Sequence, residues 1–183
     1  MADRASSLII FLSGITLLLV SSATAAPKGP PKITTILNQF KEFSVMNDLF
    51  TKYGLAEQMN DWGTLTVFVV DNAAMGPINA LPPNKAKEVL MLHAILEFYA
   101  PEKFSVKGAG KDIMMLTTLL MTTGEAHGQR GFVIANNKTP GGATFGSAIT
   151  GAQFKAKFVK GVKVEPPAIS VIQISEPIIP PGV

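Results

Sequence analysis

Two histidines carry the side chains of this chain best suited to acid–base or metal chemistry. His127 follows Glu125 by two residues in a stretch flanked by glycines. These two side chains supply two metal ligands, which is fewer than a zinc site uses. His93 lies beside Leu92 in an apolar run, where an imidazole normally bonds to an internal partner, so a core role is expected. We therefore predict no metal site and no cofactor.

Two glycine-containing motifs lack the neighbours that enzymatic chemistry requires. Gly108–Lys111 reads GAGK, but its spacing differs from that of a phosphate-binding loop and Asp112 stands where Ser or Thr is needed. Ser147 is not part of a Gly-x-Ser-x-Gly turn, and no His–Asp pair is placed to activate it. Glu97 with Glu102 is an ordinary surface pair, so a hydrolase is the weakest hypothesis. No cysteine is present, which excludes thiol catalysis. We predict no catalytic residue.

A group of lysines near the C-terminus is the main candidate for a binding surface. On one interpretation, the group forms a basic strip that attracts an acidic polysaccharide such as pectin, or an acidic partner, and its binding weakens with salt. On the other, the lysines keep an exposed sheet edge soluble and unpaired. The group consists of Lys155, Lys157, Lys160 and Lys163.

One N-glycosylation sequon is present, Asn137-Lys138-Thr139, in a predicted turn between two strands. Glycosylation of Asn137 is expected if the chain is secreted, and Pro140 directly after the threonine works against it. The alternative is an unmodified turn asparagine.

The N-terminal residues are typical of a secretory signal peptide. The apolar stretch 8–20 is shorter than the roughly 20 residues that a membrane-spanning helix needs. Ala23 and Ala25 are the small residues that precede a cleavage site, so residues 1–25 are predicted to be removed. Residues 26–32 then form a linker and residues 33–181 a single domain. The mature chain is expected to be secreted without a transmembrane span.

The charge of the chain argues against nucleic acid as a partner. The net charge is +3, a modest excess that permits contact with an acidic surface without demanding it. After Arg4 the chain has a single arginine, Arg130, so no arginine-rich patch can form.

Apolar patterns predict helices first and most strands later. Helices are expected at 33–40, at 44–54 with Ser44 as its cap, at 55–60, and at 85–98 with Asn84 as its cap. Alternation and β-branched runs predict strands at 65–70, 131–136, 143–149, 153–164 and 168–174, whereas 113–121 fits either a helix or a strand. Such segregation favours an α+β domain.

The strand at 65–70 and the residues after it resemble the first homology box of the fasciclin domain, an extracellular adhesion module. The shared residues are Thr66, Val67, Phe68, Asn72 and Ala74. Residues 92–99 are similar to the central Tyr-His region of that family, with Leu92 in place of its usual tyrosine. Residues 168–181 are similar to the terminal box without its usual polar positions. Within the family, segments 33–44 and 70–75 most resemble the plant fasciclin-like arabinogalactan proteins.

This resemblance implies a wedge of two β-sheets with N-terminal and central helices packed around it. It also implies an extracellular glycoprotein of the cell wall or apoplast that acts in adhesion. Its partners would be wall polysaccharide, an extracellular protein or a second copy of itself. His93 and Tyr99 become candidate adhesion residues. Ala26-Pro27 and Thr139-Pro140 are the only pairs of the type that carries arabinogalactan, and no glycolipid anchor is predicted.

A second hypothesis belongs to another class of protein. Methionine adapts to ligands of varied shape, and Met114, Met115 and Met121 would then line a pocket between helix and sheet. On this hypothesis the protein is a secreted binding protein for a small apolar ligand. Filling of the core is the alternative role of these methionines.

Overall fold

The computed structural model describes residues 32–105 and 112–183. The expected signal peptide, the linker before Lys32 and the Gly108–Lys111 motif lie outside the described residues. The described elements are α1 (Ile33–Leu37), η1 (Lys41–Phe43), α2 (Ser44–Lys52), α3 (Leu55–Asn60), β1 (Leu65–Val70), η2 (Asn72–Ala74), α4 (Gly76–Asn79), α5 (Pro83–Leu92), β2 (Ala94–Ile95), η3 (Pro101–Lys103), β3 (Ile113–Thr117), η5 (Leu119–Thr123), β4 (Phe132–Asn136), β5 (Thr144–Ser147), β6 (Ala156–Glu165) and β7 (Ile169–Ile174).

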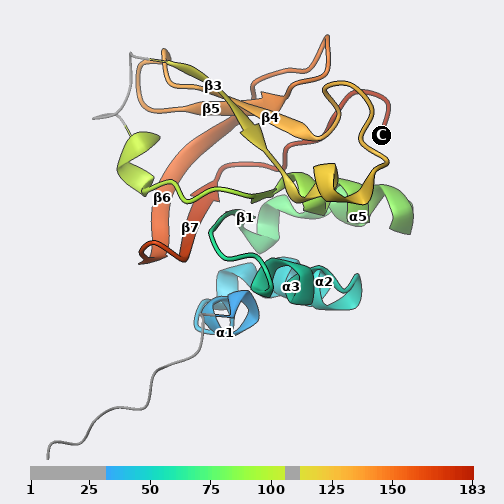
Figure 1. Cartoon of the computed structure of the whole chain (residues 1–183), viewed down its shortest axis with the longest axis vertical. Coiled ribbons are helices and arrows are strands. Elements are labelled where there is room, and N and C mark those ends of the chain that lie inside the picture. The colour runs from blue at the N-terminus through green and yellow to red at the C-terminus, as the bar shows by residue number, and fades with distance from the viewer. Residues whose placement is uncertain (1–31, 106–111) are drawn as a thin grey trace, which may run out of the picture.

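Seven strands are joined in the order β2-β1-β7-β6-β5-β4-β3. Only β1 and β7 run parallel, and the other neighbours are antiparallel. The junction of β5 with β6 rests on two residue pairs, Thr144 with Lys157 and Phe145 with Ala156, so it divides the strands into two halves. A bridge between Ile95 and Thr118 brings the two ends of the strand order together. The expected α+β wedge is confirmed, with α1, α2 and α3 at one end and β3, β4 and β5 at the other (Figure 1).

Strand β1, which belongs to the first box of the fasciclin resemblance, lies at the centre of the core. All six of its residues are buried, as its β-branched and aromatic run predicts. Phe68 contacts two rings from other elements, with centroid separations of 4.6 Å to Phe145 and 5.9 Å to Phe104. These three rings fill the space between the two halves of the sheet, and aromatic side chains bury large areas.

Two polar residues after β1 cap helices, and one of them, Asn72, joins the N-terminal helices to the sheet. The Asp71 carboxylate accepts the Ala73 N–H at 2.8 Å and so caps the short helix η2. The Asn72 side chain accepts the Val45 N–H at 3.0 Å and donates to the Lys41 carbonyl at 2.9 Å. Asn72 thereby caps α2 from another part of the chain.

The prediction that Ser44 caps the second helix is wrong. Ser44 is the first residue of α2, no side chain of the preceding residue caps this helix, and the Ser44 hydroxyl accepts from Asn72 at 3.0 Å. A distant asparagine satisfies the N-terminal donor that a local serine was expected to satisfy.

The predicted helix 85–98 is too long and its predicted cap is wrong. Helix α5 begins at Pro83, because proline suits the first helical turn, and it ends at Leu92. The chain then extends so that Ala94 and Ile95 pair with β1. Pairing with the central strand therefore overrides the helical spacing of the apolar residues beyond Leu92.

Strand β6 departs from the regular alternation expected over 153–164. It begins only at Ala156, and its register against β7 shifts twice, between Phe158 and Lys160 and between Gly161 and Lys163. Each shift inserts one extra residue, as a β-bulge does. Segment 113–121, which fits either a helix or a strand by sequence, contains strand β3 followed by the start of the short helix η5.

Replacing Asn72 with alanine should lower the free energy of unfolding by about 1–2 kcal/mol, because it leaves the Val45 N–H without its acceptor. Urea unfolding of the purified protein measures the loss. Asn79→Ala is the matched control, since Asn79 is an exposed residue at the end of α4. Equal stability losses in the two variants would contradict the capping role of Asn72.

Candidate ligand-binding groove

His93 is a fully buried residue that joins α5 to the C-terminal segment. Its Nδ1 lies 2.8 Å from the Val89 carbonyl and its Nε2 lies 3.1 Å from the Ile178 backbone nitrogen. The Ile178 N–H can only donate, so Nε2 is the acceptor and Nδ1 carries the proton. Burial lowers the pKa of His93 to about 4, which keeps the ring neutral. This is the core role that its apolar neighbours indicate.

Tyr99, the second adhesion candidate, has different partners. Its hydroxyl donates to the Glu97 carboxylate, and its N–H donates to the Thr66 hydroxyl at 2.8 Å. Burial, together with the Glu97 carboxylate, raises the pKa of Tyr99. Thr66 also donates to the Glu97 carbonyl at 2.7 Å, so these bonds fix the 97–99 segment on β1. His93 and Tyr99 share no hydrogen-bond partner among the described residues.

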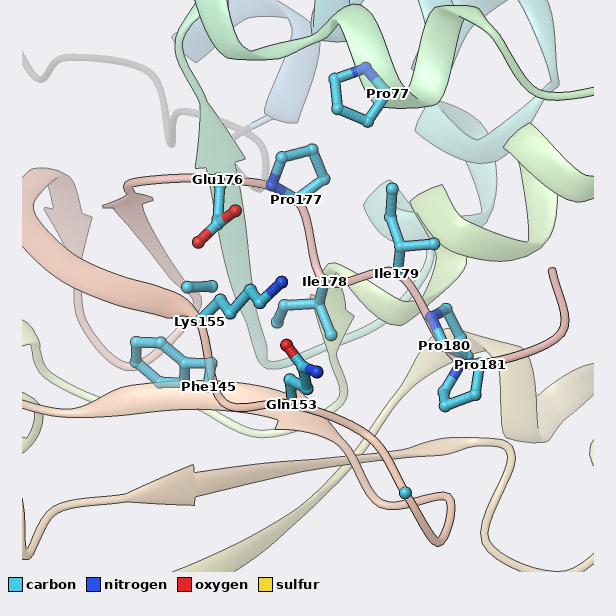
Figure 2. Close-up of a pocket in the computed structure, with 12 residues that line it drawn as sticks. Pro77, Phe145, Gln153, Lys155, Glu176, Pro177, Ile178, Ile179, Pro180 and Pro181 are labelled. Carbon is cyan, nitrogen blue, oxygen red and sulfur yellow. The ribbon is translucent and has the colours of Figure 1, made fainter.

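A groove of about 420 Å³ lies between the start of β6 and the C-terminal segment (Figure 2). Most of its lining residues are apolar and four are prolines, but polar atoms supply the larger share of its exposed surface, and three polar side chains contribute to it. The lining residues are Pro77, Phe145, Gly151, Gln153, Lys155, Ala156, Glu176, Pro177, Ile178, Ile179, Pro180 and Pro181.

Hydrogen bonds hold the two walls of the groove together. The Lys157 N–H donates to the Ser175 hydroxyl at 3.0 Å, and the Ser175 N–H donates to the Lys157 carbonyl at 2.9 Å. Beyond Ser175, the bond from Ile178 to His93 ties the C-terminal wall to the core. The segment after β7 is therefore a structural wall of the groove.

A glycine allows the other wall to approach β5. A Cβ atom on Gly146 would lie 2.8 Å from the Gln153 carbonyl oxygen, closer than real Cβ atoms come to backbone. The absence of a side chain at Gly146 thus permits the segment that carries Gln153 and Lys155 to lie against β5.

Opposite charges face each other across this groove. The Lys155 side chain extends into it from the start of β6, and Glu176 stands on the C-terminal wall (Figure 2). Among residues 32–105 and 112–183, neither side chain takes part in an ion pair. Gln153 adds an amide to the same wall as Lys155. Sequence analysis identified Lys155 but missed Glu176 and Gln153, which no local motif marks.

The other three predicted lysines form a row on one face of β6, which we call the lysine row (Lys157, Lys160 and Lys163). Lys160 pairs with Gln173 and Lys163 with Val171, two positions of β7 that share a face. Lys157 lies on that face too, because Phe158 next to it pairs with Ile174 on the opposite face.

The two bulges of β6 create this row. Side chains three residues apart in a regular strand point to opposite faces, and each extra residue restores the alignment. Lys157 and Lys160 are exposed, and Lys163 is partly exposed and lies 3.4 Å from the Glu165 carboxylate.

Asn137, the predicted glycosylation site, is in a turn but is 1% exposed. Its amide nitrogen lies 3.5 Å from the Met114 sulfur, and its side-chain oxygen has no partner among the described residues. A glycan on that nitrogen would require the side chain to leave its buried position.

The methionines and the second histidine do not form sites of the kinds considered from sequence. Met114 and Met115 are successive residues of β3 and face opposite sides of the sheet, with Met115 52% exposed. A Cβ atom on Gly131 would lie 2.3 Å from the Met121 sulfur, so Met121 packs against that glycine instead. His127 and Glu125 are exposed, and the described residues contain no group of three or more potential metal ligands of the His, Cys, Asp or Glu type.

Comparison with known proteins gives several sequence relatives that are fasciclin-like arabinogalactan proteins. The chain is 38% identical to fasciclin-like arabinogalactan protein 14 of Arabidopsis thaliana over 80% of this chain and 56% of that protein. It is 35% identical to protein 3 of the same series over 100% of this chain and 62% of the relative, and 35% identical to protein 10 over 99% and 41%. The chain thus spans about three fifths or less of these relatives' lengths. No family model matches.

A solved structure supports the same fold. The FAS1 domain pair of the insect cell adhesion molecule fasciclin I matches with a TM-score of 0.51 and 14% identity, over 78% of this chain and 47% of that chain. The fold is therefore that of a fasciclin domain. The resemblance to the plant fasciclin-like arabinogalactan proteins is confirmed by the sequence relatives. Among the described residues, no helix has the length and apolar character to cross a membrane.

Acidification should destabilise the fold through His93. The unfolded chain protonates this histidine near its ordinary pKa of 6.5, whereas the folded chain does so only near pH 4. The neutral histidine contributes its full stabilisation above about pH 6.5, and this contribution is lost as the pH falls from 6.5 towards 4. The largest possible loss in the free energy of unfolding is about 3 kcal/mol. Urea unfolding at about pH 7 and about pH 4.5 measures the loss.

His93→Gln does not titrate in this range and should lose less stability on acidification than the unmodified protein, although it starts from a lower value. His127→Gln is the control substitution, because His127 is an exposed histidine outside the core. If His93→Gln lost as much stability on acidification as the unmodified protein, His93 would not be the source of the effect.

Proposed function

We propose that this chain is a secreted, non-enzymatic adhesion module of the extracellular matrix that binds acidic wall polysaccharide along the lysine row of β6. In this proposal residues 1–25 direct secretion and the fasciclin domain presents a rigid surface. The protein holds its partner without breaking bonds, and no described residue is assigned a catalytic role.

The observation that carries the proposal is the alignment of three lysines by two bulges. Without the bulges, Lys160 would face away from Lys157 and Lys163. A row of ammonium groups along one strand face matches the repeated carboxylates of an acidic polymer. The stretch of β6 that holds both bulges pairs with β7 alone, because the pairing of β6 with β5 ends at Lys157, so protection of this open edge is the alternative explanation of the bulges.

The relatives agree with this proposal in kind. The solved structural relative is described as a cell adhesion molecule, and the sequence relatives are described as arabinogalactan proteins. Neither description names an acidic polysaccharide, so the partner rests on the lysine row alone. The alternative of an apolar ligand loses its main support because the three methionines do not face a common space.

Binding to immobilised polygalacturonate should depend on the lysine row and on salt. The triple variant Lys157→Gln, Lys160→Gln, Lys163→Gln should lose most of its retention, because it removes all three positive charges of the lysine row. Retention of the unmodified protein should fall as salt rises, since contacts between exposed charges are screened. Affinity chromatography across a salt series measures both effects.

The matched control removes the same net charge elsewhere, with Lys41→Gln, Lys52→Gln and Lys138→Gln, three exposed lysines outside β6. This control should keep most of its retention. Equal losses of retention in the two triple variants would show that only total charge matters and would contradict binding along the lysine row.

A further inference from the structure

We infer that the groove beside the lysine row is a binding site for one hexuronate unit of an acidic polysaccharide, recognised through its carboxylate and its hydroxyls together. This inference rests on the proposed function and deepens it. The lysine row attracts the polymer by charge, whereas the groove selects its chemistry.

The polar groups of the groove match the groups of a uronic acid. Lys155 supplies an ammonium that points into the groove and has no ion-pair partner among the described residues. It is suited to a carboxylate, because charge-assisted hydrogen bonds are the stronger class. Glu176 on the facing wall can accept hydrogen bonds from two hydroxyl groups, and the Gln153 amide can both donate and accept.

The apolar walls match the carbon face of a sugar ring. Pro177 and Ile179 are partly exposed at the groove, and Pro77 of α4 faces it from another element (Figure 2). Their C–H surfaces can pack against the C–H face of a ring and exclude water from the polar contacts. The volume of about 420 Å³ lies at the lower end of the roughly 300–1,000 Å³ typical of small-molecule sites.

Glu176 makes the groove selective for anions that carry hydroxyl groups, so that it does not bind every anion. A carboxylate on the wall repels an anion that has no hydroxyls to offer it, and like charges in one site cost energy. A uronate offsets that repulsion by donating its hydroxyls to Glu176 while its own carboxylate contacts Lys155. A neutral sugar satisfies Glu176 and leaves Lys155 without a counterion.

The groove and the lysine row are continuous along the chain. Lys155 lies two residues before Lys157, a separation of about 7 Å in an extended chain. Ser175, which pairs with Lys157, directly precedes Glu176. A polymer unit in the groove would therefore lie at one end of the lysine row. The positive charge of the row favours a ligand with net negative charge.

Three short probes test the groove apart from the row: trigalacturonate, galactotriose as the neutral sugar, and triglutamate as an anion without sugar hydroxyls. Calorimetric titration of the full folded protein should show trigalacturonate binding more tightly than either control probe. Lys155→Gln should weaken trigalacturonate binding about tenfold, as expected for the loss of one charge-assisted contact.

Glu176→Gln provides the sharper result, because its effect should have opposite signs for two probes. Trigalacturonate should bind more weakly when a hydroxyl acceptor loses its charge, and triglutamate should bind more tightly when the repulsion is removed. Lys163→Gln, at the far end of the row, is the control and should change trigalacturonate binding little. Thermal unfolding checks that each variant is folded.

Equal binding of trigalacturonate and triglutamate would overturn the inference, as would Lys155→Gln binding with unchanged affinity. A shift of the same sign for both probes in Glu176→Gln would also overturn it. Retention on polygalacturonate is measured separately with the row variant. If polygalacturonate retention depends on the lysine row but trigalacturonate binds Lys155→Gln as tightly as the unmodified protein, the groove is rejected and the proposed function stands. If the unmodified protein does not bind polygalacturonate at all, the proposed function is rejected.

Discussion

The parallel pairing of β1 with β7 is the constraint on which the rest of the structure depends. Six consecutive residue pairs join the first strand to the last, from Leu65 with Ile169 to Val70 with Ile174. Parallel strands of this kind are normally buried on both faces, and all of β1 and most of β7 are. The pairing places the helices before β1 and the segment after β7 at fixed positions on one core.

His93 connects that pairing to the groove. The histidine leaves α5 just before β2 pairs with β1, and its ring accepts the Ile178 N–H beyond the end of β7. Burial makes the neutral ring the stable form, and the neutral ring is the form that can both donate and accept. A residue proposed for adhesion by family resemblance is thus buried, and any effect of it on binding would pass through the wall that it holds.

The surface chemistry depends on irregularities rather than on regular strands. Two bulges align the lysine row, and the missing side chain of Gly146 lets the Lys155 segment lie against β5. A regular β6 would distribute its lysines over two faces, one of them the inner face that carries Ala156 and Phe158. Local departures from ideal geometry therefore separate a basic surface from the core along the same strand.

The sequence by itself determined the local elements and the fold type. Strand β1 follows from residue type and spacing, and the family resemblance follows from three segments in order. Only the tertiary structure decided where α5 ends, which residue caps α2, how β6 is registered and which charges face each other across the groove. The physical reason is range: strand propensity and side-chain caps act over a few residues, whereas β2 pairing with β1, Asn72 reaching Val45, and Lys155 facing Glu176 join residues that only the folded chain brings together.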